Sequence, residues 1–72
     1  MNYPYSILIQ WSDEDQKYIA TLPEFGPYAR THGATYSEAL EMAEEVLELL
    51  IESYQESDRV LPVPRSLELY AA

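Results

Sequence analysis

The segment Gly33-Ala34-Thr35-Tyr36-Ser37-Glu38-Ala39-Leu40 decides the fold of this chain, because it marks the start of one long helix. Thr35 and Glu38 have the spacing of a capping box. In such a box the Thr hydroxyl accepts the backbone N–H of Glu38, and the Glu carboxylate accepts the N–H of Thr35. Gly33 precedes the box and suits a tight turn. The sequence therefore predicts that a strand-rich first half ends here and that a helix begins at Tyr36.

After this start, apolar side chains recur every three or four residues, which is the period of an amphipathic helix. The apolar stripe comprises Ala39, Leu40, Ala43, Val46, Leu47, Leu50, Ile51 and Tyr54. We expect a helix from Tyr36 to about Glu56, with the stripe packed on a sheet. Met42 and Leu49 lie at the border of the stripe, where they could be peripheral core or could contact a neighbouring subunit.

Upstream of the helix, alternating apolar and polar residues predict β-strands with one buried face. The expected strands are Tyr5–Trp11, Lys17–Leu22 and Tyr28–His32, with a short fourth strand at Ser66–Tyr70. A polar loop over residues 12–16 joins the first two strands into a hairpin, and two late prolines favour an extended segment after the helix. The predicted fold class is α+β in the order β-β-β-α-β: a three-stranded antiparallel sheet with one long helix on one face and a short fourth strand.

Length and composition limit the classes of protein to consider. The chain has 72 residues, which fits a single domain over residues 1–72, and a core this small is often supplemented by homo-oligomerisation. It has no cysteine, no secretion signal and no apolar segment long enough to cross a membrane, so we expect a cytoplasmic protein. Thirteen carboxylates against four basic residues give a net charge of −9. Such a surface repels nucleic acids and anionic lipid and attracts basic proteins.

The acidic residues concentrate on the helix face opposite the apolar stripe. The glutamates there are Glu38, Glu41, Glu44, Glu45, Glu48, Glu52 and Glu56, and no Lys or Arg lies between Tyr36 and Glu56. This face could be merely solvated, or it could be the counter-surface for a basic partner. Under the second interpretation, Glu44, Glu48 and Glu52 would steer the partner electrostatically. Glu24, Phe25 and Tyr28, on the loop beside a Gly-Pro turn, would contact it directly.

No pattern of residues predicts a catalytic or metal site. The Asp13-Glu14-Asp15 cluster lacks the spacing of a calcium loop and fits a charged hairpin loop better. His32 is the single histidine and has no second metal ligand at a helical spacing. We therefore expect no cofactor, no metal and no enzymatic activity. The remaining enzymatic hypothesis is a metal-dependent nuclease that uses Asp13 or Asp15 with Glu48.

Several short motifs occur in an order that resembles the HicB-like antitoxin family. They are Tyr5-x-Ile7-x-Ile9, Leu22-Pro23-Glu24-Phe25, Gly33-x-Thr35-x-x-Glu38-Ala39-Leu40 and Pro62-x-Pro64, and the resemblance covers roughly residues 5–64. It implies the partial RNase H-like fold of that family. The chain departs from the family pattern at Phe25-Gly26-Pro27 and at Ala34, which affects loop details. Many members also carry a DNA-binding segment, whereas here we expect no separate DNA-binding domain and no direct contact with nucleic acid.

The resemblance implies a function in protein binding. Antitoxins of this family neutralise small, basic HicA-like toxins that cleave mRNA by means of a histidine. The expected function is therefore neutralisation of such a toxin by protein–protein association. The alternative is an orphan homo-oligomeric interaction domain that binds neither toxin nor DNA.

Overall fold

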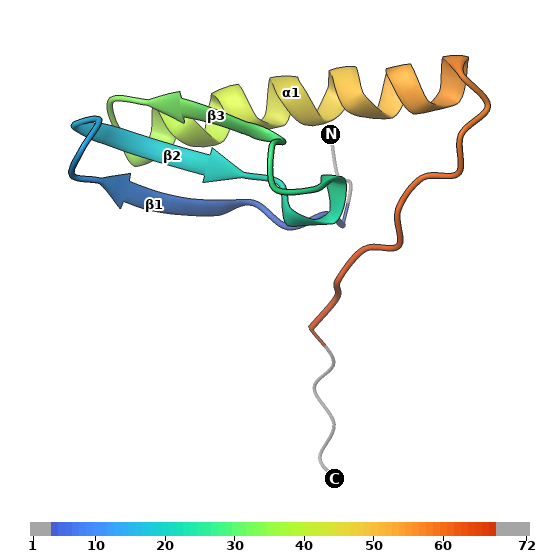
Figure 1. The fold of residues 1–72 in the computed structure, drawn as a ribbon, viewed down its shortest axis with the longest axis horizontal. Helices are drawn as coiled ribbons and strands as arrows, with labels where there is room; N and C mark the ends of the chain where they lie inside the picture. Colours follow the sequence, from blue (N-terminus) through green and yellow to red (C-terminus); the bar gives the residue numbers. More distant parts are fainter. Residues whose placement is uncertain (1–3, 68–72) are drawn as a thin grey trace, which may run out of the picture.

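The computed structural model describes residues 4–67 and contains one sheet and one long helix. The elements are β1 (Leu8–Ser12), β2 (Lys17–Thr21), the short 3-10 helix η1 (Pro23–Phe25), β3 (Arg30–Gly33) and α1 (Tyr36–Glu56). The strands pair in the order β1-β2-β3, and both pairs are antiparallel. α1 crosses one face of this sheet and packs chiefly on β3 and β2 (Figure 1). The predicted α+β class is confirmed.

The register of the hairpin separates the two faces of the sheet. Ile9 lies opposite Ala20, and Trp11 lies opposite Tyr18, on the side that α1 covers. The predicted loop between the strands is also present, because the N–H of Gln16 donates to the carbonyl of Ser12 at 2.8 Å. Alternation then leaves Leu8, Ile19 and Arg30 among the residues of the opposite face, which no element of the described chain covers.

The core is built from small and branched side chains at the contact between sheet and helix. The buried residues are Ala20, Leu22, Ala39, Ala43, Leu47 and Ile51. Gly33 lets the helix approach closely, since a Cβ at this position would lie 2.4 Å from the backbone nitrogen of Ala39. The glycine thus serves close packing. It is the last residue of β3 and lacks the positive φ of a tight turn, so the turn that the sequence predicts at Gly33 is not seen.

The start of α1 confirms one half of the predicted capping box and corrects the other. The Thr35 hydroxyl accepts the N–H of Glu38 at 3.0 Å, as predicted. The Glu38 carboxylate, however, accepts the N–H of Ala34 at 2.9 Å and not that of Thr35. The side chain therefore reaches one residue further back along the chain.

All three strands are shorter than predicted, and β2 ends at Thr21, one residue before the predicted Leu22. Tyr5–Ile7 lies outside β1, because the N–H of Ser6 donates to the Glu24 carboxylate at 3.1 Å instead of to a strand neighbour. β3 begins at Arg30 and not at Tyr28, which lies in a turn after the Gly-Pro pair. At β1 the bond from Ser6 to the distant Glu24 replaces the predicted ladder, and at β3 the turn bond from the N–H of Ala29 to the carbonyl of Gly26 at 3.3 Å replaces it.

The segment after α1 forms an extended stretch, here called the C-terminal arm (residues 57–67). α1 ends as Asp58 takes a φ of 55° and the N–H of Arg59 donates to the carbonyl of Tyr54 at 2.9 Å. Ser66 and Leu67 are not in a strand, so the predicted fourth strand is not confirmed at these two residues. The rest of that prediction, residues 68–70, lies outside the described residues.

The apolar stripe of α1 is buried or half-buried except at Leu40. Leu40, predicted as core, is 42% exposed, and Leu49, predicted as peripheral core or a subunit contact, is 65% exposed. Met42, on the same border of the stripe as Leu49, is also exposed.

Candidate functional site

The acidic face of α1 is fully accessible. All seven helix glutamates are exposed, and within residues 4–67 only Glu38 makes a side-chain hydrogen bond, at the helix start. Among the described residues, no hydrogen bond joins a helix glutamate to a basic side chain. The basic residues are elsewhere: Lys17 and Arg30 are on the sheet, and Arg59 and Arg65 are on the C-terminal arm. The negative charge of this face therefore remains available to an external cation.

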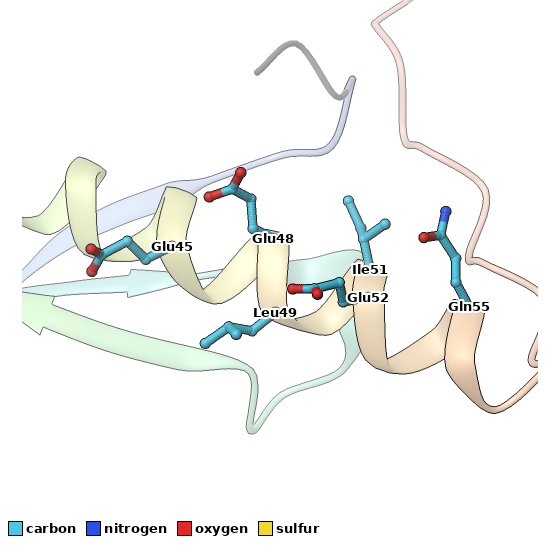
Figure 2. Close-up of a pocket in the computed structure, with 6 residues that line it drawn as sticks. All are labelled: Glu45, Glu48, Leu49, Ile51, Glu52 and Gln55. Carbon is cyan, nitrogen blue, oxygen red and sulfur yellow. The ribbon is translucent and has the colours of Figure 1, made fainter.

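The predicted steering residues lie together on this face. Glu44, Glu48 and Glu52 are spaced by four residues, so they follow one line along the helix. Glu48 and Glu52 also border a surface groove of about 580 Å³. Figure 2 shows its lining side chains on successive turns of α1: Glu45, Glu48, Leu49, Ile51, Glu52 and Gln55. Leu49 and Ile51 point to different sides of the helix, and Ile51 is 2% exposed, so Leu49 is the exposed apolar side chain among these acidic and amide residues.

The predicted contact residues on the loop have three different environments. Tyr28 is 94% exposed and is free to contact another protein. Phe25 is half-buried and packs edge-to-face between Tyr5, at 5.0 Å, and Tyr54, at 5.5 Å between ring centroids. It therefore joins the loop to the C-terminal end of α1.

Glu24, the third loop residue, is occupied by contacts within the chain. Its carboxylate accepts the backbone N–H of Ser6 at 3.1 Å, the Ser6 hydroxyl at 3.0 Å and the backbone N–H of Arg65 at 2.9 Å. Partial burial raises the pKa of this carboxyl, but the hydrogen bonds from Arg65 and Ser6 outweigh it and lower the pKa below its ordinary 4.5. The charged form of Glu24 thus holds three segments together.

The C-terminal arm contributes contacts that sequence reasoning missed. The Tyr5 hydroxyl donates to the Pro62 carbonyl at 2.7 Å, and the Arg59 guanidinium lies 4.1 Å from the centre of the Tyr54 ring. The single signal for these contacts in the sequence was the pair of late prolines, which predicts an extended backbone but not its location. Pairing over 57 residues of sequence separation has no periodic signature.

The hairpin acids do not assemble a metal site. Asp15 bonds the Ser12 hydroxyl at 3.1 Å, and the Gln16 amide donates to the Asp13 carbonyl at 2.7 Å, which is ordinary turn chemistry. Over residues 4–67 no group of three or more His, Asp or Glu side chains could hold a metal ion. His32 is exposed on β3, on the face of the sheet away from the helix.

In comparisons with known proteins, no protein-family model matches the chain, and no curated protein matches it either. In the described part of the chain, no helix has the length and apolar character to span a bilayer.

Proposed function

We propose that this chain is an antitoxin-like binding module that neutralises a small, basic, HicA-like toxin that cleaves mRNA. The proposal rests on the resemblance of the sequence motifs to the HicB-like family. The observation that carries it is the row of exposed helix glutamates with no basic partner among the described residues. The partial RNase H-like relationship and the short fourth strand belong to this proposal.

The acidic face costs the isolated chain some stability, which is a reason to look for a partner. The pairs Glu41–Glu45, Glu44–Glu48, Glu48–Glu52 and Glu52–Glu56 are each four residues apart. Each like-charge pair costs roughly 0.2–0.5 kcal/mol, so the four together cost about 1–2 kcal/mol. A basic protein would remove this repulsion on binding, and long-range attraction would speed the encounter.

Tyr28 is the proposed aromatic anchor of the complex. Exposed aromatic side chains that become buried supply much of the energy of a protein interface. Phe25 holds the loop against α1, so Tyr28 sits on a supported backbone and loses less freedom on binding. The charged face would then set the association rate, and Tyr28 would set the dissociation rate.

The test is co-expression with a short, Lys/Arg-rich protein encoded next to this chain. We expect co-purification and relief of that protein's growth arrest. Replacing Glu44, Glu48 and Glu52 by Gln should slow association at low salt at least tenfold and flatten its salt dependence. A matched control replaces Asp13, Glu14 and Asp15 by their amides, which removes the same charge from the hairpin and should slow association less than about threefold.

Two outcomes would refute the proposal. One is a basic neighbour whose toxicity is unaffected and which fails to co-purify. The other is an equal loss of association rate in the helix and hairpin variants, which would mean that net charge matters and the helix face does not.

A second candidate function is an orphan homo-oligomeric interaction domain. It is favoured by the exposed apolar side chains at Leu49 on α1 and at Val60 and Val63 on the C-terminal arm. Light scattering that shows an oligomer, together with the lack of any binding partner in pull-down, would favour this candidate over the antitoxin-like module.

A further inference from the structure

From Arg59 onward, the polar contacts of the C-terminal arm recur every three residues, at Arg59, Pro62 and Arg65. Val60 and Val63, also three residues apart, point into water with exposed fractions of 91% and 83%. A repeat of three residues per turn belongs to the polyproline II helix, which has no internal hydrogen bonds and is typical of segments rich in proline. The spacing of contacts and of exposure therefore indicates that the arm docks in this conformation.

The arm lies on a surface lined by aromatic rings. Tyr5, Phe25 and Tyr54, here called the aromatic row, pack edge-to-face with ring centroids 5.0 and 5.5 Å apart. The Arg59 guanidinium lies 4.1 Å from the centre of the Tyr54 ring, at one end of the row. Pro62 accepts the Tyr5 hydroxyl at the other end. Proteins bind proline-rich segments on aromatic surfaces of this kind, because a stiff polyproline II backbone loses little entropy on docking.

Pro62 and Arg65 are held through their main-chain atoms. The carbonyl of Pro62 accepts the Tyr5 hydroxyl at 2.7 Å. The N–H of Arg65 donates to the Glu24 carboxylate at 2.9 Å. Any extended peptide can offer a carbonyl and an N–H at this spacing, so neither hydrogen bond requires a particular side chain. Selectivity then comes from Leu61, which packs on the hydrophobic core, and from the prolines that fix the backbone.

We propose that the aromatic row is a binding site for a proline-rich segment of another protein, and that the arm occupies this site in the free chain. The arm defines the ligand: an extended segment of the form Arg-x-Leu-Pro-x-Pro, in which the arginine stacks on Tyr54 and the leucine reaches the core. A basic segment also suits a chain with a net charge of −9. The inference does not rest on the proposed function, whose contacts are the helix glutamates and Tyr28.

The arm acts in this site as a tethered competitor. Its link to α1 keeps it close to the aromatic row, at an effective concentration on the order of millimolar. A free segment has to overcome this concentration, so it binds the parent chain weakly and binds a chain with a weakened arm more tightly. The arm thereby excludes ligands that fit the aromatic row less well than it does.

Two glycine substitutions test this competition. The probe is a synthetic peptide of residues 59–67, titrated into the full chain by calorimetry. Pro62→Gly and Pro64→Gly together leave the aromatic row intact and make an unbound segment more flexible. In the chain, the pair should tighten peptide binding about fivefold, because the arm competes less well, whereas in the peptide the same pair should weaken binding about fivefold. Effects of the same sign, or no effect in either setting, would overturn the inference.

NMR of the isotope-labelled chain locates the bound peptide. Displacement of the arm should move the amide signal of Arg65 to its position in an unstructured peptide, and the glycine variant should need less peptide for this than the parent chain. The amide of Ser6 also bonds Glu24 but lies outside the arm, so its signal is the internal control and should stay near its folded position. Circular dichroism checks the fold of the glycine variant, and the parent chain gives the Arg65 readout without any substitution. A peptide that binds while the Arg65 signal stays in place, or that binds neither chain at millimolar concentration, would refute the assigned site.

Discussion

Glu24 shows how much a single side chain can contribute to a fold this small. Its carboxylate bonds Ser6, 18 residues before it, and Arg65, 41 residues after it. The N-terminal segment, η1 and the C-terminal arm all depend on this one group. The sequence identifies Glu24 only as an acidic residue in a loop, because neither partner lies at a spacing that a local pattern would reveal.

The contacts of Glu24 predict a specific loss of stability in acid. The pKa of the folded protein's carboxyl lies below its ordinary value of 4.5, so the contribution of the charged form is fully present above that pH. It is lost as the pH falls through the lower, folded value. Glu24→Gln should destabilise the protein by about 1 kcal/mol at neutral pH, because it weakens charge-assisted hydrogen bonds. Urea unfolding at several pH values measures both effects.

Glu14→Gln, on the exposed hairpin, is the control and should change stability by less than about 0.5 kcal/mol. In NMR, the amide protons of Ser6 and Arg65 should shift as the Glu24 carboxyl titrates. Amide shifts that follow no transition below pH 4.5, or equal unfolding curves for both variants, would contradict the role assigned to Glu24.

At the scale of elements, α1 starts where its sequence signals coincide. The Thr35 cap and the apolar period both place the start at Tyr36, and the structure agrees to the residue. The cap satisfies one of the backbone N–H groups that a helix start leaves without a partner. α1 provides much of the buried core, so stability lost at its start affects the whole chain.

Thr35→Ala should destabilise the protein by about 1 kcal/mol, since it removes the acceptor of the Glu38 N–H at 3.0 Å. Ser37→Ala, two residues later on the exposed surface of the helix, is the matched control and should be close to neutral. Thermal unfolding followed by circular dichroism compares the two. Equal midpoints would show that Thr35 does not cap the helix in solution.

The elements also show where prediction from sequence stops. The hairpin and α1 follow from local periodicity and turn chemistry, which a sequence displays directly. The start of β1 does not, because the N–H of Ser6 bonds a side chain far along the chain. The exposed glutamates of the candidate site were predictable from the helical period. The burial of Phe25 was not predictable, because it depends on contact with Tyr54, which lies far along the sequence on α1.

Over the whole molecule, negative charge gathers on one layer. The helix face carries seven exposed glutamates, whereas Lys17 and Arg30 belong to the strands of the other layer. The resulting repulsion along α1 is screened by salt. Stability and binding are therefore opposed here: a change that relieves the repulsion also removes the charge available to a basic partner.

Glu52→Lys tests this opposition. The substitution turns two like-charge pairs, with Glu48 and Glu56, into opposite-charge pairs, so the free energy of unfolding should rise by about 1 kcal/mol. Stability should also respond less to added NaCl than in the parent chain. Denaturant unfolding at low and high salt measures both changes. A variant that is less stable than the parent at low salt would show that repulsion along α1 is negligible.

All the aromatic side chains of residues 4–67 except Tyr28 fall into two separate groups, and this gives the protein two intrinsic optical reporters. Trp11, the one tryptophan, stacks edge-to-face on Tyr18 at 5.1 Å, and Tyr18 in turn contacts Tyr36 at 4.3 Å, beside the start of α1. Tyr5 and Tyr54 flank Phe25 near the other end of the helix. The fluorescence of Trp11 therefore reports on the hairpin. The absorbance of the tyrosines includes a contribution from Tyr5, near η1. Coincident melting of the two signals would mean that both halves unfold as one cooperative unit.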